Sequence, residues 1–182
     1  MIYMSRTRRD PAMTDEDRTD AFVEQFSPSR SLEISGFMHL LVDYHKICGE
    51  VISHPDLTEE QREIYRNAGS LAGYDLEDHL DYLTDEYAAE GVEDGPERRV
   101  TSPAPFLAAG YQHGVTTYTQ VTNDLLSSSA FSEKEHGSAK SFYMAVGLGL
   151  AEELERLLRD PDVYLQRLTE YADRQASAPD EH

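Results

Sequence analysis

Positive charge is scarce in this sequence, and lysine is almost absent. Acidic residues number 35 against 16 basic ones, which gives a formal net charge of −19. The lysines are Lys46, Lys134 and Lys140. Nucleic-acid-binding proteins need a basic face for their phosphate contacts, so this balance argues against such a role. A basic cluster at 5–9, SRTRR, leaves open a regulator that contacts DNA through an N-terminal arm.

The excess of short acidic side chains over lysine resembles the composition of cytoplasmic proteins that work in molar salt. At about 1 M salt the screening length falls to about 3 Å, so repulsion within a dense carboxylate surface is largely suppressed. Carboxylates also hold water where a longer lysine stem would expose hydrocarbon. We therefore expect adaptation to high salt; the alternative is an ordinary acidic protein from a GC-rich bacterium.

Cysteine and long apolar runs are scarce as well. The single cysteine, Cys48, cannot form an internal disulfide, so nothing points to an oxidising compartment. The longest apolar run, Phe142–Ala151, is far shorter than the roughly 20 residues that a membrane-spanning helix needs. The N-terminal residues lack the apolar stretch of a secretory signal peptide. These features predict a soluble cytoplasmic protein with no membrane association.

Amphipathic spacing and capping signals predict an all-α fold. We expect a flexible polar arm at 1–28, a single helical domain at 29–176 and a frayed tail at 177–182. Thr58–Gln61 and Ser132–Glu135 have the sequence of capping boxes, which mark helix starts. The predicted architecture is a four-helix-bundle-like core followed by a short fifth helix at the C-terminal end, with helices at about 31–53, 58–91, 103–126, from 132 and from 160.

Two stretches test the helical interpretation. Val115–Thr122 is rich in residues that favour strands, but neither of its alternating sets is apolar. Helical spacing instead places Leu107, Tyr111 and Tyr118 on one apolar face, so we expect a helix there. In the second helix, a pair of glycines predicts either a kink or a close helix contact at Gly69 and Gly73.

His45 and Cys48 are the most suggestive pair of reactive side chains. Both lie on the helical stripe Ile34, Met38, Leu41, His45, Cys48 and Ile52, so we expect both to point into the core. A thiol buried among apolar groups has a raised pKa and low reactivity. No CxxC or HxxxH pattern accompanies the pair. The pattern predicts packing residues and not a metal or nucleophile site.

Histidines keep a metal-binding bundle as an alternative. His45, His79, His113 and His136 fall one on each of four predicted helices, on or beside the inward face. Di-iron bundles use a Glu from each of two helices and Glu-x-x-His from the other two, and the one match here is Glu133-x-x-His136. Counting residues along straight antiparallel helices, at a constant rise per residue, places His79 at the same height as His113. The same count places His45 and His136 together at a different height. The main expectation is no cofactor; the alternative is an iron or zinc site with redox or hydrolytic activity.

Paired acidic residues suggest a third kind of site. Glu60-x-x-Glu63 and Asp78-x-x-Asp81 resemble the paired acidic motifs of all-α nucleotide pyrophosphohydrolases, which hold Mg²⁺ between helices. The second pair has aspartate where that family has glutamate. Helical spacing places both aspartates almost opposite the apolar side formed by Leu76, Leu80, Leu83 and Tyr87. We therefore expect these carboxylates to face solvent.

The Phe142–Ala151 segment is apolar almost all round and rich in small residues. Glycine weakens a helix by about 1 kcal/mol relative to alanine, so Gly147 and Gly149 should serve close packing. Gly110 and Gly114 of the preceding helix are expected to form the matching surface. A helix of this kind is either central in the bundle or covered by another subunit, through the candidate interface residues Phe142, Ala145, Leu148 and Gly149.

Each candidate catalytic arrangement in the sequence is either incomplete or faces the wrong way. We therefore predict a non-enzymatic helical interaction protein, a subunit, adaptor or accessory factor of a larger assembly. Its expected partner is another protein or a second copy of itself.

Overall fold

The computed structural model describes residues 27–90, 102–161 and 166, and this part of the chain contains helices and no strands. The helices are α2 (Pro28–Ile52), α3 (Glu59–Glu90), α4 (Ala104–Ser127) and α5 (Glu133–Arg159). The predicted all-α fold with four long helices is confirmed. The basic N-terminal arm, the C-terminal tail and nearly all of the predicted fifth helix lie outside the described residues.

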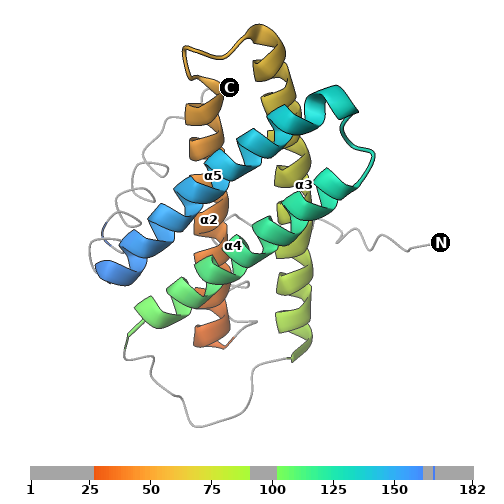
Figure 1. The fold of residues 1–182 in the computed structure, drawn as a ribbon. Helices are drawn as coiled ribbons and strands as arrows, with labels where there is room; N and C mark the ends of the chain where they lie inside the picture. The colour runs from red at the N-terminus through yellow and green to blue at the C-terminus, as the bar shows by residue number, and fades with distance from the viewer. Residues whose placement is uncertain (1–26, 91–101, 162–165, 167–182) are drawn as a thin grey trace, which may run out of the picture.

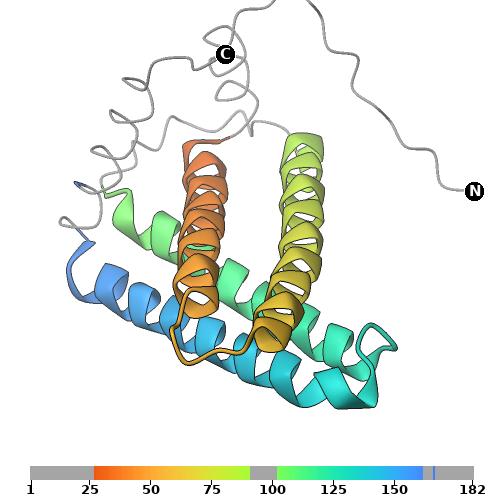
Figure 2. The same cartoon turned by 90° about the horizontal axis from the view of Figure 1, so that it is seen from above.

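The four helices are arranged in two layers (Figures 1 and 2). α2 and α3 run side by side in opposite directions, and α4 and α5 do the same in the second layer. The second layer crosses the first obliquely, and the contact between α2 and α4 is the most extensive. The core is therefore enclosed between two helical hairpins.

Local hydrogen bonds fix where α3 and α5 begin. Thr58 N–H donates to Gln61 Oε1 at 2.9 Å, and Gln61 N–H donates to Thr58 Oγ1 at 3.2 Å. At the start of α5, the Glu135 carboxylate accepts from Ser132 N–H at 2.9 Å and from Ser132 Oγ at 2.6 Å. Both predicted start signals are thus hydrogen-bonded pairs that satisfy groups at the helix ends.

The threonine-rich stretch of α4 is helical, and its hydroxyls bond to backbone carbonyls of the same helix. Thr117 Oγ1 donates to His113 O at 3.1 Å, and Thr122 Oγ1 donates to Tyr118 O at 2.9 Å. Two further threonines bond in the same way. These bonds satisfy hydroxyls that would otherwise compete with the helix, and the prediction of a helix here is confirmed.

Buried tyrosines tie neighbouring helices together. Tyr44 Oη of α2 donates to Gly69 O of α3 at 2.6 Å, and Tyr118 Oη of α4 donates to Tyr143 O of α5 at 2.8 Å. Tyr143 Oη then joins the two layers by donating to Ala68 O at 3.1 Å. Each ring adds apolar burial while its hydroxyl keeps a partner, so these side chains can fill the core without an unsatisfied polar group.

Glycines on α4 face α2 and not α5. A Cβ atom at Gly110 would lie 1.8 Å from Glu33 O, and one at Gly114 would lie 2.9 Å from Leu40 Cδ1. The expectation that these glycines match the Phe142–Ala151 segment is therefore wrong. The glycines of α4 permit close approach where α4 crosses the other layer. At the contact between α4 and α5 the glycine belongs to α5, where a Cβ atom at Gly147 would lie 3.3 Å from Tyr118 Cε1.

The glycines within α3 mark close contacts. α3 runs without interruption from Glu59 to Glu90. A Cβ atom at Gly69 would lie 3.3 Å from Phe142 Cζ, and one at Gly73 would lie 3.4 Å from Tyr44 Cε1. These two positions therefore let aromatic rings of α2 and α5 pack directly on the α3 backbone.

Candidate functional site

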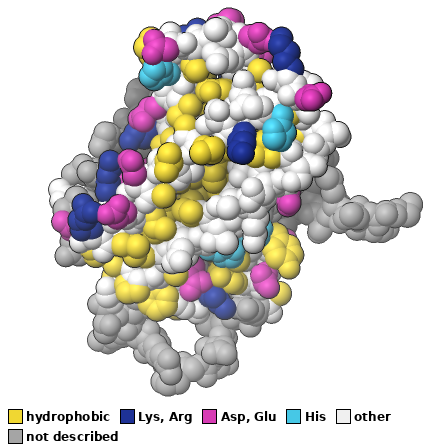
Figure 3. Space-filling model, viewed as in Figure 1, with side chains coloured by type: hydrophobic (Ala, Val, Ile, Leu, Met, Phe, Trp, Pro, Cys, Tyr) yellow, Lys and Arg dark blue, Asp and Glu magenta, His cyan; other side chains and the backbone are white. Residues whose placement is uncertain are grey.

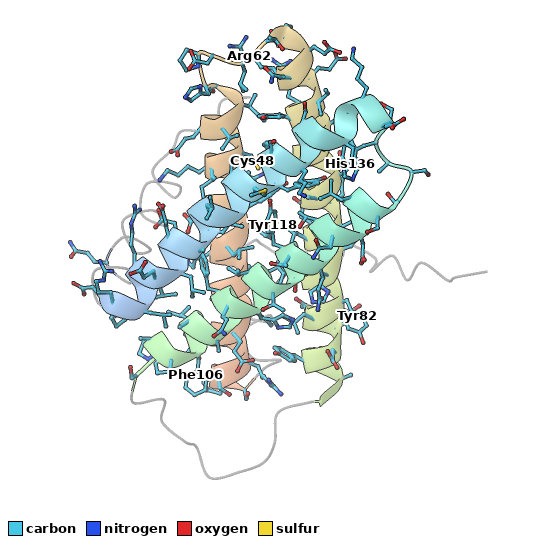
Figure 4. All side chains as sticks on the ribbon, in the orientation of Figure 1. Cys48, Arg62, Tyr82, Phe106, Tyr118 and His136 are labelled. Carbon is cyan, nitrogen blue, oxygen red and sulfur yellow. The ribbon has the colours of Figure 1, made fainter. Side chains whose placement is uncertain are left out.

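Cys48 lies in the core, as the sequence predicts. Its exposed fraction is 7%, and Figure 4 shows it among the helices of both layers. Burial raises the pKa of the Cys48 thiol to about 11, and a hydrogen bond with Tyr44 offsets only part of this effect. The thiol is therefore protonated at neutral pH, which makes it a poor nucleophile and a poor metal ligand.

An open cavity of about 500 Å³ lies between α2 and α3 and reaches Cys48. His45 stands at its rim with 61% of its side chain exposed, and His45 Nε2 lies 3.6 Å from Glu77 Oε1. The prediction that His45 points into the core is wrong, because the buried face of α2 is centred on Leu40 and Tyr44. The rim histidine and carboxylate therefore have each other as neighbours, while Cys48 lies at the wall of the cavity.

Two of the candidate metal-ligand histidines come together between α3 and α4. His79 Nε2 and His113 Nε2 lie 3.3 Å apart. The Phe37 ring of α2 stacks on His79 with centroids 5.9 Å apart and meets His113 edge-on at 5.8 Å. Burial lowers the pKa of His79 and the neighbouring His113 lowers it further, whereas Glu86 acts in the opposite direction. The lowered pKa favours neutral imidazole, the form that binds metals.

The other members of the candidate metal set lie elsewhere. His136 is exposed at the α4–α5 turn, where its Nε2 lies 3.1 Å from Leu126 O (Figure 4). Glu133 is also exposed, and His45 has Glu77 as its neighbour, so the expected pairing of His45 with His136 is not seen. Within the residues that the structure describes, no three His, Cys, Asp or Glu side chains gather in a position to hold a metal ion.

The paired acidic residues form no common site. Glu60, Glu63, Asp78 and Asp81 are all exposed, as the spacing predicts for the two aspartates. Glu60 Oε1 instead accepts from Lys134 Nζ of α5 at 2.6 Å. The likeness to the Mg²⁺-binding motifs of nucleotide pyrophosphohydrolases therefore ends at the sequence pattern.

α5 buries one side and exposes an opposite side that is also apolar. Met144, Leu148 and Leu158 are 60%, 66% and 62% exposed. They belong to an outward row that we call the α5 outer face, formed by Ser141, Met144, Leu148, Ala151, Glu155 and Leu158. Figure 3 shows hydrophobic side chains gathered along α5 on this side of the molecule, with acidic side chains mainly towards its ends. This face departs from the charged surface that the composition predicts.

The four candidate interface residues divide between the two sides of α5. Phe142 is fully buried, and a Cβ atom at Gly149 would lie 2.9 Å from Ile47 Cγ2, so both positions pack within the chain. Ala145 and Leu148 are exposed. In the described residues, no helix combines the length and hydropathy needed to cross a membrane.

Sequence reasoning missed the continuation of the α5 outer face beyond Ala151. The 3–4 spacing that joins Ser141 to Leu158 could have revealed it, because such a row falls on one side of a helix. Sequence reasoning also missed Phe37 as the residue that borders both histidine rings, and no local pattern indicates this role.

Comparisons with known proteins add no assignment to these sites. No protein-family model matches the chain, and searches of curated proteins and of solved structures likewise find no match.

Proposed function

We propose that the protein is a non-enzymatic helical interaction module that works at high salt and associates with a second copy of itself through the α5 outer face. The observation that supports this proposal is the exposed apolar row on α5 of a strongly acidic chain. Charged residues make up 28% of the sequence, yet Lys140 is the only one between Gly137 and Ala151. A contiguous apolar patch framed by polar residues is typical of an interaction surface.

An antiparallel second copy of α5 fits the spacing of this face. Around a two-fold axis midway between Leu148 and Ala151, each copy's Leu148 lies opposite Ala151 of the other. The same symmetry sets Met144 against the flexible stem of Glu155. It also sets Leu158 against the small side chain of Ser141. Rows spaced by three and four residues pack in this manner in two-stranded helical interfaces, and a two-fold axis closes the assembly at two copies.

Charge complementarity also favours the second copy. In the antiparallel arrangement Lys140 lies level with Arg159 of the other copy and comes within about 6 Å along the helix axis of Glu155, which pairs with Arg159 in its own chain. A lysine side chain spans this distance and can reach the carboxylate of that pair. In the described part of its own chain, Lys140 makes no ion pair. The charge of −19 on each copy opposes association at long range, so added salt should strengthen the contact.

Equilibrium sedimentation tests the proposal. We expect the wild-type chain to sediment at twice its mass of 20.6 kDa, and the Leu148→Glu variant at the mass of one chain. Burying one Leu or Met side chain contributes about 1.5–3 kcal/mol to the free energy of association. A carboxylate at the centre of the face removes the contribution of Leu148 and places an unpaired charge in the interface.

Met38→Glu is the matched control, because Met38 is a half-exposed apolar residue of α2 in the other layer. This variant should keep the mass of two chains. Two results would show that the α5 outer face does not carry the association. One is a wild-type mass of a single chain at both low and molar salt, and the other is a Leu148→Glu variant that keeps the mass of two chains.

A further inference from the structure

We propose that His79 and His113 form a two-histidine site for Zn²⁺ at the α3–α4 contact. The two ring nitrogens that face each other, Nε2 of each residue, are 3.3 Å apart. Zinc binds imidazole nitrogen at about 2.0–2.1 Å, so two such ligands at the tetrahedral angle lie about 3.3–3.4 Å from each other. The observed separation therefore already equals that of two ligands on one tetrahedral ion.

The surroundings hold both rings in this arrangement. Phe37 contacts His79 face to face, with an interplanar angle of 21°, and His113 edge to face, with an angle of 77°. Tyr82 borders His79 on the same helix, with ring centroids 6.3 Å apart. Each histidine also lies within a long helix, so binding would require little reorganisation of the backbone or of the rings.

The remaining positions of the ion are open to solvent. Both histidine side chains are partly exposed, and no third His, Cys, Asp or Glu of the described chain completes a cluster with them. Two water molecules would therefore complete the tetrahedral coordination of the ion. Glu86 of α3 is the neighbouring negative charge. In the hydrogen bond between the rings, one Nε2 carries the proton that it donates to the other. On binding, that proton leaves Nε2 and the same ring takes a proton from solvent on Nδ1, so that both Nε2 lone pairs are free for the ion, which replaces the hydrogen bond.

The site belongs to one chain and does not depend on the α5 outer face. Both ligands come from α3 and α4 of the same copy, so self-association and zinc binding are separable. It also differs from a di-iron centre, because the carboxylates of such a centre are missing from the described surroundings and Glu133 and His136 lie at the α4–α5 turn.

Titration calorimetry of the untagged, chelator-treated chain with Zn²⁺ tests the proposal. Excess Mg²⁺ should be present, because it occupies surface carboxylates but has little affinity for imidazole. We expect one Zn²⁺ per chain and a melting temperature that rises with Zn²⁺ concentration, since the ion binds the folded chain preferentially. His79→Gln and His113→Gln should each abolish the stoichiometric binding, whereas His45→Gln and His136→Gln should retain it. Leu148→Glu should bind as well as the wild type.

A second measurement keeps the test decisive if either ligand variant fails to fold. In the wild-type chain, Zn²⁺ should shift the imidazole nitrogen resonances of His79 and His113 and leave those of His45 and His136 in place. Co²⁺ substituted at the site should give the intense visible absorption of a tetrahedral ion. Absent binding, binding that survives both ligand substitutions, or equal shifts at all four histidines would overturn the site.

Discussion

Gly36 of α2 and Gly110 of α4 lie in the same helix crossing, and each meets the backbone of the other helix. A Cβ atom at Gly36 would lie 2.1 Å from Leu107 O, and one at Gly110 would lie 1.8 Å from Glu33 O. Neither distance is compatible with a side chain, so the two layers can approach this closely only because both positions are glycine. Phe37, the residue after Gly36, contacts both His79 and His113 beside this crossing.

Gly110→Ala is expected to destabilise the fold strongly, because the new methyl group must push α4 away from the Glu33 backbone. Overpacking of this kind typically costs about 1–3 kcal/mol, and the contact with rigid backbone places Gly110 at the upper end. Urea unfolding followed by circular dichroism would measure the change.

Gly137→Ala is the matched control for that substitution. Gly137 also lies within a helix, but nothing lies within 4 Å of a Cβ atom built there. The control should be stabilised by up to about 1 kcal/mol, because alanine favours a helix more than glycine does. Equal effects of the two substitutions would mean that the crossing is not as close as described.

Gly149→Leu is expected to lower the free energy of unfolding by about 1–3 kcal/mol, because α5 packs on Ile47 at this point. The Ile47 side chain has more freedom than backbone, so the effect should be smaller than that of Gly110→Ala. Gly137→Leu, on an open part of α5, should raise stability slightly, because leucine also favours a helix more than glycine does. Comparing the melting temperatures of the two variants would show whether the destabilisation comes from packing at position 149 or from any leucine introduced into α5.

Cys48 should behave as a packing residue with a protonated thiol. Cys48→Ala is expected to destabilise the fold by about 1 kcal/mol through loss of a small buried side chain. Because burial raises the thiol pKa from 9.0 to about 11, the folded chain binds more protons than the unfolded chain between these values. The contribution of Cys48 to stability should therefore fall as pH rises through that window.

Comparing wild type and Cys48→Ala across pH 8–11 removes the ionisation of tyrosines remote from Cys48, which both proteins share. The pKa values of Tyr44, Tyr118 and Tyr143 are raised mainly by burial, which the substitution leaves in place, with a smaller contribution from Cys48. Labelling of the native thiol by a reagent at neutral pH should be far slower than labelling of the unfolded chain. Equal labelling rates would place the thiol at the surface.

Stability should rise with salt, because the chain carries −19 charges and most acidic side chains of α3 are exposed. Between about 0.1 M salt, where the screening length is about 10 Å, and about 1 M, where it is about 3 Å, carboxylate repulsion is progressively screened. Melting temperatures measured in KCl on the Leu148→Glu variant would report this effect without a change in association. A constant melting temperature across this range would remove the argument for high-salt adaptation.

Local interactions made the helices predictable. The Thr58–Gln61 and Ser132–Glu135 pairs lie three residues apart, so their sequence alone indicates where a helix begins. The interior position of Cys48 and the solvent-facing position of Asp78 and Asp81 also follow from spacing on a single helix.

Contacts between helices needed the tertiary structure. Sequence spacing places His45 and Cys48 on the same side of α2. Which part of that side is buried depends on where α3, α4 and α5 cover the helix, and His45 lies outside the covered part. The partner of Gly110 likewise depended on which helix crosses α4, and a small residue can pack against any neighbour.

The contact between His79 and His113 depends both on their positions along the sequence and on the packing of the two layers. Counting residues along antiparallel helices places His79 and His113 at the same level, because the rise per residue is constant. The count places His45 and His136 together equally well, yet these face different neighbours. The sequence determined the helices and the heights of their residues, whereas only the packing of the two layers decided the rotation of each helix, because rotation depends on contacts summed over all the helices at once.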